Sequence, residues 1–123
     1  MSESVFDDEI DCQAMDSFME SFEQVAYMVY SNSKNKGFWD EPRNEGEAIA
    51  LIHSELSEGL EALRHGNGPS DHISEFTGVE EEMADAIIRI MDLSYGKGWR
   101  VAEAIIEKMR FNESRAKKHG KEF

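Results

Sequence analysis

Apolar side chains recur every three or four residues along most of this 123-residue chain, which is the spacing of helices that bury one face. No segment alternates between apolar and polar residues as a half-buried strand does. Clusters of glycine, proline and asparagine interrupt the helical pattern and divide it into four segments. We therefore predict an all-α fold, a bundle of four main helices over residues 14–32, 44–65, 79–95 and 101–118.

The third segment is the most apolar, because hydrophobic residues cover most of its circumference. A helix of this kind lies at the centre of a fold, and its polar stripe faces water or a polar cavity. The stripe contains Glu81, Glu82, Asp85, Arg89 and Asp92. Pairing of Arg89 with Asp85 and Asp92 at helical spacing would be a purely structural explanation of this stripe.

The composition indicates one soluble domain. A chain of 123 residues can bury one core but not two. Its 26 acidic and 13 basic residues argue against a nucleic-acid partner. Cys12 is the only cysteine, which excludes an internal disulfide. With no apolar run of membrane-spanning length and no signal-peptide pattern, we expect a cytoplasmic protein without a membrane partner. Residues 1–13 are expected to form an acidic lead and residues 14–123 the domain.

Two short acidic pairs, Glu55-x-x-Glu58 and Glu82-x-x-Asp85, lie in the second and third segments. Residues three apart on a helix lie about 60° apart around its axis, so each pair presents both carboxylates on one side. Two such helices side by side would bring four carboxylates together, and these charges repel one another unless a cation lies among them. Hard oxygen ligands of this kind suit Mg²⁺ or Mn²⁺. The pairs therefore predict a metal site.

Glu55 is the most informative of these carboxylates because it lies within the apolar arc of its helix, beside Leu51 and Ile52. A carboxylate on the buried side of a helix costs on the order of several kcal/mol unless it is paired or binds a metal. Glu58 lies at the edge of the arc, whereas Glu61 points away from it and is typical of a solvated charge. Glu55 needs a buried partner and Glu61 does not.

Positively charged and amide side chains follow one face of the fourth segment, where Lys108, Asn112 and Arg115 are four and three residues apart. Lysine and arginine complement the charge and geometry of phosphate, so we expect phosphate contacts from this face. Cations near a helix C-terminus are also favoured by the helix dipole alone. Trp39, in the loop between the first two segments, has two explanations: stacking on a base near a polar site, or simple burial.

Taken in order along an all-helical chain, the motifs are Glu55-x-x-Glu58, Glu81-Glu82-x-x-Asp85 and Lys108-x-x-x-Asn112-x-x-Arg115. This ordered set resembles the MazG-like nucleotide pyrophosphohydrolases of the all-α NTP pyrophosphatase superfamily. The similarity runs from about Trp39 to the C-terminus. It implies Mg²⁺-dependent hydrolysis of a nucleoside triphosphate to the monophosphate and pyrophosphate, in a homodimer or homotetramer. The first helix, rich in phenylalanine and methionine, is the assembly surface that we expect.

The resemblance also implies roles for individual residues. The metal would be held by Glu55, Glu58, Glu82 and Asp85. The phosphates would be held by Lys108 and Arg115, with Asn112 on phosphate or sugar. One carboxylate of the set accepts a proton from the attacking water; the residues do not decide which, and Glu58, beside Glu55 at the edge of the arc, is our choice.

Two alternatives stay open at this stage. The chain also fits the phosphoribosyl-ATP pyrophosphohydrolase branch of the same superfamily. From a different class of protein, a non-catalytic acidic helical module that binds a protein partner would have the same composition. Such a module would not be stabilised by Mg²⁺, whereas a metal enzyme would be.

Overall fold

The four predicted helices are present in the structure, a computed structural model that describes residues 9–115. They are α1 (Glu9–Asn35), α2 (Glu45–Arg64), α3 (Gly78–Lys97) and α4 (Val101–Glu113). Within residues 9–115 the one β-type contact is an isolated bridge between Pro69 and Thr77. The all-α prediction with four helices is therefore confirmed.

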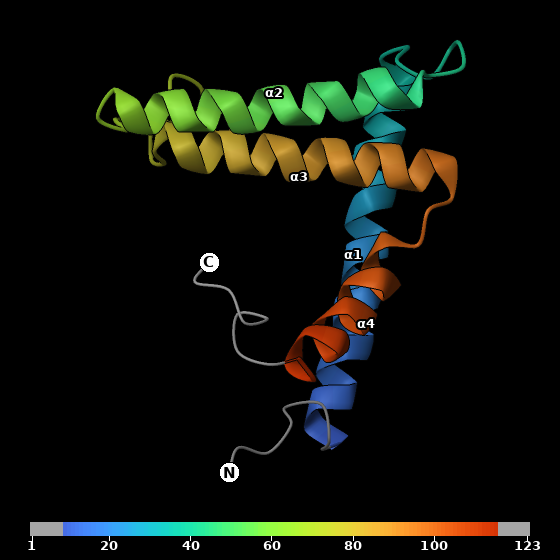
Figure 1. Cartoon of the computed structure of the whole chain (residues 1–123). Coiled ribbons are helices and arrows are strands. Elements are labelled where there is room, and N and C mark those ends of the chain that lie inside the picture. The colour runs from blue at the N-terminus through green and yellow to red at the C-terminus, as the bar shows by residue number, and fades with distance from the viewer. Residues whose placement is uncertain (1–8, 116–123) are drawn as a thin grey trace.

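The helices are arranged as two pairs (Figure 1). α2 and α3 run antiparallel side by side, and α4 runs antiparallel to the N-terminal half of α1. The C-terminal half of α1 crosses the α2–α3 hairpin and packs against α3. The buried apolar cluster lies between the two hairpin helices, at Ala48, Ile52, Ala86 and Leu93. Further buried apolar residues lie on the other helix pair, at Ala26 of α1 and at Ala102 and Ile106 of α4.

Local signals explain most of the helix ends. The Asn44 side chain accepts a hydrogen bond from the backbone N–H of Glu47 and so begins α2, while Thr77 and Glu80 form a capping box at the start of α3. α1 begins at Glu9, five residues before its predicted start. α4 ends at Glu113, and residues 116–118 of the predicted fourth helix lie outside the described residues.

α3 continues past its predicted end at residue 95, through Gly96 to Lys97, and Gly98 caps it with a φ of 72°. The Trp39 ring lies directly on Gly96: a Cβ there would be 2.3 Å from the Trp39 Cη2 atom. The Trp39 ring also contacts Tyr30, with ring centroids 5.4 Å apart. An aromatic cluster thus joins α1, the α1–α2 connection and the end of α3.

Many large apolar side chains remain exposed in a single protomer. Leu56, Leu60 and Leu63 follow one face of α2 and are each about half exposed, forming an apolar stripe. Met83 and Ile87 of α3 are exposed as well, and α1 exposes Val25, Tyr27 and Met28. Contiguous apolar surface of this kind marks sites of protein contact.

Replacing Gly96 with alanine is expected to destabilise the fold by about 1–3 kcal/mol, because the new methyl group overlaps the rigid Trp39 ring. Urea unfolding followed by circular dichroism measures this loss. Gly68→Ala is the matched control, since a Cβ at Gly68 meets nothing within 4 Å. Equal free energies of unfolding for the two variants would show that the fold tolerates a methyl group at position 96 beside the Trp39 ring.

Candidate metal centre

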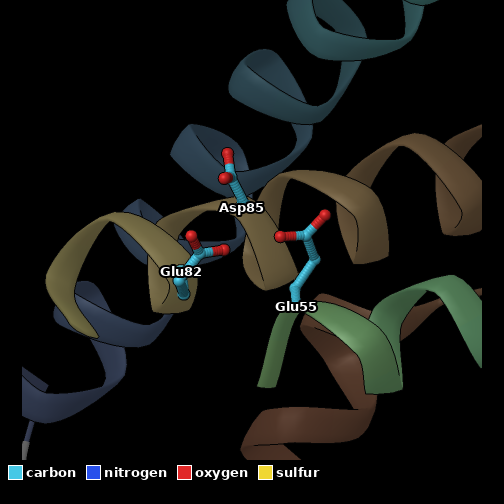
Figure 2. Close-up of side chains that lie close together, drawn as sticks. All are labelled: Glu55, Glu82 and Asp85. Atoms are coloured by element: carbon cyan, nitrogen blue, oxygen red, sulfur yellow. The ribbon is translucent and has the colours of Figure 1, made fainter. Parts of the chain in front are cut away.

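Three of the four carboxylates that the acidic pairs singled out meet between α2 and α3. Glu55, Glu82 and Asp85 each place one carboxylate oxygen within 4.8 Å of the others. Glu82 and Asp85 lie one turn apart on α3, and Glu55 faces them from α2 (Figure 2). We refer to these three residues as the acidic cluster.

The acidic cluster forms because α2 and α3 approach each other closely. A Cβ on Gly59 of α2 would lie only 3.4 Å from the Cβ of Glu82, and a Cβ on Gly78 only 3.0 Å from that of Ala62. Gly59 is one turn beyond Glu55, so this contact brings Glu55 opposite the acidic face of α3. A glycine within a predicted helix was the available signal for such a contact, because it has a helix-propensity cost of about 1 kcal/mol relative to alanine.

Glu55 is 8% exposed and has a charged partner, Arg89, whose own side chain is 39% exposed. The Arg89 Nε donates a hydrogen bond to Glu55 Oε1 over 2.9 Å. Burial alone would raise the pKa of Glu55. Its hydrogen bonds with Glu82 and Arg89, together with the positive charge of Arg89, instead hold this pKa below its ordinary value. Arg89 therefore pairs with a carboxylate on α2, so ion pairs within α3 alone do not explain its position.

Glu82 and Asp85 show the cost of bringing carboxylates together. Burial, followed by hydrogen bonds with Glu55 and Glu58, raises the pKa of Glu82 to about 8. The Oε2 atom of Glu82 is buried, and no N–H or O–H of the described residues donates to it. Burial and the charge of Glu55 also raise the pKa of Asp85. The acidic cluster thus requires either a retained proton or a bound cation, and its hard oxygen donors suit Mg²⁺ or Mn²⁺.

The neighbouring acidic residues of the motifs lie at the margin of this cluster. The Glu58 side chain is exposed and lies outside the three-residue group, although it is near enough to Glu82 to contribute to the raised pKa of that residue. Glu81 turns toward the α2–α3 connection, where it accepts a hydrogen bond from Ser70 and bonds the His72 Nδ1 over 2.7 Å. These two bonds hold the pKa of Glu81 below its usual range. Glu81 therefore anchors the connection that precedes α3.

The predicted phosphate-binding residues lie on the other helix pair. Lys108 and Asn112 are exposed on α4, and Arg115 is exposed just beyond its end. The cationic groups of Lys108 and Arg115 lie over the Phe111 ring, 4.6 and 5.2 Å from its centroid. α4 packs along α1 below the hairpin (Figure 1). The structure does not bring these three residues to the acidic cluster of the same protomer.

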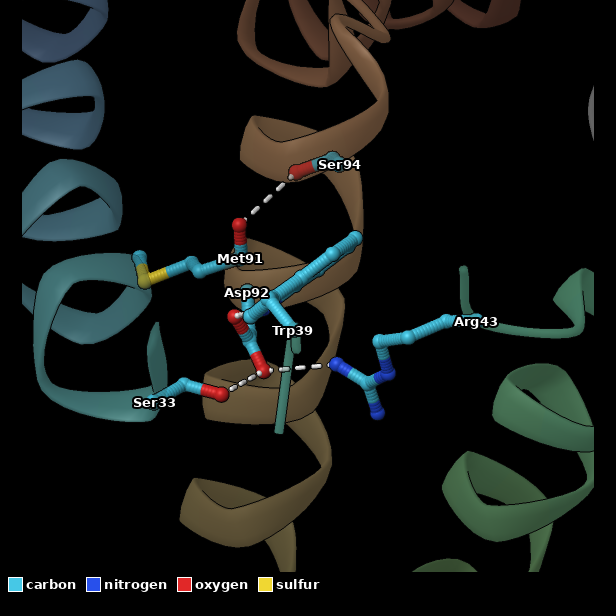
Figure 3. Close-up of polar contacts among 6 residues, drawn as sticks. All are labelled: Ser33, Trp39, Arg43, Met91, Asp92 and Ser94. Atoms are coloured by element: carbon cyan, nitrogen blue, oxygen red, sulfur yellow. Dashed lines mark hydrogen bonds and ion pairs between the residues drawn. The ribbon is translucent and has the colours of Figure 1, made fainter. Parts of the chain in front are cut away.

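Trp39 belongs to a buried junction centred on Asp92 of α3 (Figure 3). The Trp39 indole N–H and the Ser33 hydroxyl each donate a hydrogen bond to Asp92 over 2.8 Å. The Arg43 guanidinium donates a third over 2.9 Å and also covers the Trp39 ring, 4.8 Å from its centroid. Of the two explanations for Trp39, the structure favours burial. Asp92 likewise pairs with a residue outside its own helix.

A cavity of about 340 Å³ adjoins the acidic cluster. It lies between the C-terminal half of α1, the α1–α2 connection and α3, and both Glu55 and Asp85 contribute to its wall. The other lining residues are Val29, Asn32, Ser33, Lys36, Phe38, Arg43, Ile88, Arg89 and Asp92. Small-molecule sites start at about this size, and this wall combines apolar and charged groups as such sites do.

Comparison with protein-family models, with curated proteins and with solved structures yielded no match. Within residues 9–115, no helix combines the length and the apolar character that a membrane crossing requires. The functional interpretation therefore rests on the residues and their geometry.

The metal-free protein is expected to lose stability as the pH rises from about 5 to about 8. Glu82 has a pKa of about 8 in the folded state against 4.5 ordinarily, so its contribution is complete below about pH 4.5 and is lost as the pH passes about 8. In Glu82→Gln the side chain at this position is neutral at every pH from about 5 to about 8. The free energy of unfolding of this variant in EDTA, measured relative to the parent, should therefore increase as the pH rises from about 5 to about 8.

Urea unfolding at about pH 5 and about pH 8 measures that difference. Glu20→Gln, at an exposed position on α1, is the control and should leave the pH dependence of the parent unchanged. Parallel pH profiles for the parent and Glu82→Gln would mean that Glu82 ionises normally.

Proposed function

We propose that this protein is a Mg²⁺-dependent nucleoside triphosphate pyrophosphohydrolase that converts (d)NTP to (d)NMP and pyrophosphate. The observation that carries the proposal is the convergence of Glu55, Glu82 and Asp85 from two helices, with a buried Glu82 oxygen that receives no hydrogen bond from residues 9–115. The ordered motifs of the sequence support the same activity. A cytoplasmic location, where nucleoside triphosphates and Mg²⁺ are both available, belongs to the proposal.

The donor set fits the metal that this activity requires. Glu55, Glu82 and Asp85 would hold the ion, with Glu58 completing the set from α2. A divalent ion at such a site neutralises phosphate charge and assists the attack of water on phosphorus. In the overall reaction, water adds to the α-phosphorus, the bond to the bridging oxygen breaks and pyrophosphate leaves.

The residues of the chain supply the remaining functions. Glu58 is our candidate to accept the proton of the attacking water, since its carboxylate is exposed to solvent yet lies beside Glu82. Arg89 offsets the charge of Glu55 in the metal-free protein and lines the cavity that adjoins the acidic cluster.

Assembly is the second part of the proposal. Because α4 packs away from the acidic cluster, the phosphate contacts proposed for Lys108, Asn112 and Arg115 require a second protomer. The exposed stripe of Leu56, Leu60 and Leu63 on α2 supports a homodimer or homotetramer, since association would remove this apolar surface from water.

Replacing Glu55 with glutamine should reduce pyrophosphate release from NTPs by at least about a hundredfold, because the acidic cluster loses a charged oxygen ligand. The same variant should lose the Mg²⁺-dependent rise in melting temperature that the parent shows. For the parent, that rise corresponds to about 2.7 kcal/mol at a metal concentration one hundred times Kd.

Glu61→Gln is the control for this experiment, because Glu61 is exposed on α2 and pairs with the exposed Arg64. It should retain turnover and metal stabilisation. A parent protein whose melting curve ignores both Mg²⁺ and Mn²⁺ would contradict the proposal and favour a non-catalytic module.

Leu60→Glu is expected to weaken the assembly and raise its dissociation constant at least about tenfold, because association would bury a charge in the α2 stripe. Light scattering coupled to size-exclusion chromatography measures the mass. Ser54→Glu adds the same charge on another face of α2 and should leave the assembly intact. A monomeric parent would contradict the assembly.

A further inference from the structure

We infer that the cavity beside the acidic cluster receives the nucleoside end of the substrate, with Phe38 as the stacking surface and Asn32 as the side chain that distinguishes bases. This inference rests on the proposed function, which it extends from the phosphates to the base. The sequence pattern pointed to Trp39 for base stacking and singled out neither Phe38 nor Asn32.

The cavity and the acidic cluster are continuous. Glu55 and Asp85 belong to both, so a triphosphate held through a cation at these carboxylates extends into the cavity at its nucleoside end. Lys36 lies just beyond the end of α1, where its backbone N–H donates to the Asn32 carbonyl oxygen. It also lines the cavity, which puts a cationic residue and Asn32 on the same stretch of wall. The wall therefore offers complementary groups for phosphate, sugar and base.

Phe38 provides the aromatic surface that a base needs. Its side chain is 63% exposed although it lines the cavity. The neighbouring Trp39 donates its indole N–H to Asp92 and has its ring on Gly96, so that ring is already covered. Stacking of a base on Phe38 would remove the phenyl ring and the face of the base from water, and any of the bases can stack in this way. Val29 and Ile88 add further apolar wall.

Asn32 provides the polar group that tells bases apart. Its side chain is exposed at the cavity, and among the described residues its amide makes no hydrogen bond. A carboxamide offers both a donor and an acceptor, so it can pair with a base edge through two hydrogen bonds. Aspartate at this position keeps the acceptors and loses the donors. Asn32→Asp should therefore favour cytosine, which has an amino group where uracil has a carbonyl oxygen.

Equilibrium binding of hydrolysis-resistant α,β-imido analogues of ATP, GTP, CTP and UTP, measured by calorimetry with Mg²⁺, tests the inference without turnover. Phe38→Ala should weaken all four analogues roughly tenfold, because each base loses its stacking partner. Phe38→Tyr keeps an aromatic face and should bind like the parent. Asn32→Asp should raise the affinity ratio of the CTP analogue to the UTP analogue roughly tenfold.

Two matched controls separate these effects from general ones. Phe76→Ala removes an exposed phenylalanine from the α2–α3 connection, and Asn35→Asp adds a charge on α1 at a residue that does not line the cavity. Both should bind the four analogues like the parent.

The outcomes distinguish this inference from the proposed function. Analogue binding that responds to Phe38 and Asn32 supports the cavity assignment even if no NTP is hydrolysed, and that combination would overturn the proposed function alone. Metal-dependent hydrolysis by a parent whose Phe38→Ala and Asn32→Asp variants bind all four analogues unchanged would overturn the cavity assignment alone. A parent that neither binds the analogues nor hydrolyses NTPs would overturn both.

Discussion

The short distance between α2 and α3 is the constraint on which the other features of this molecule depend. At Gly59 a methyl group would just reach contact with the Glu82 Cβ, so α2 and α3 lie close enough for Glu55 to face Glu82 and Asp85. Apolar side chains of similar volume would pack there at lower cost, because clustered carboxylates lose hydration and repel one another. The protein keeps this unfavourable arrangement between α2 and α3, where Glu55 is buried and Glu82 and Asp85 are half-buried. A site maintained against stability in this way is typical of a functional one.

The features that the sequence predicted are those that depend on neighbours along the chain. Helical periodicity and the caps at Asn44 and Thr77 are local, so the four helices were found to within a few residues. The conflict between the charge of Glu55 and its apolar surroundings is local as well. Partners across helices were not predictable in the same way. Arg89 sits one turn from two acidic residues on its own helix, yet it bonds to Glu55 on α2, because the distance between helices decides the pairing.

Periodicity also identifies a face of a helix without identifying what that face meets. Lys108 and Asn112 share a face of α4 as their spacing requires, but α4 packs along α1 and away from the carboxylates. Leu60 is similar: it lies on an apolar face of α2, yet its side chain is 49% exposed. Both observations have the same physical basis, which is that packing between helices, and not spacing along one helix, decides what each face meets.

The junction at Asp92 has a consequence for the neighbouring loop. Three donors from α1 and the α1–α2 connection converge on one carboxylate, and the Trp39 ring contacts both Gly96 and Tyr30. Phe38 is bonded directly to this immobilised residue, so the backbone at the cavity mouth is ordered before any ligand arrives. The conformational entropy of that segment is lost during folding instead of during association, which is how preorganised sites reach useful affinity from a small contact area.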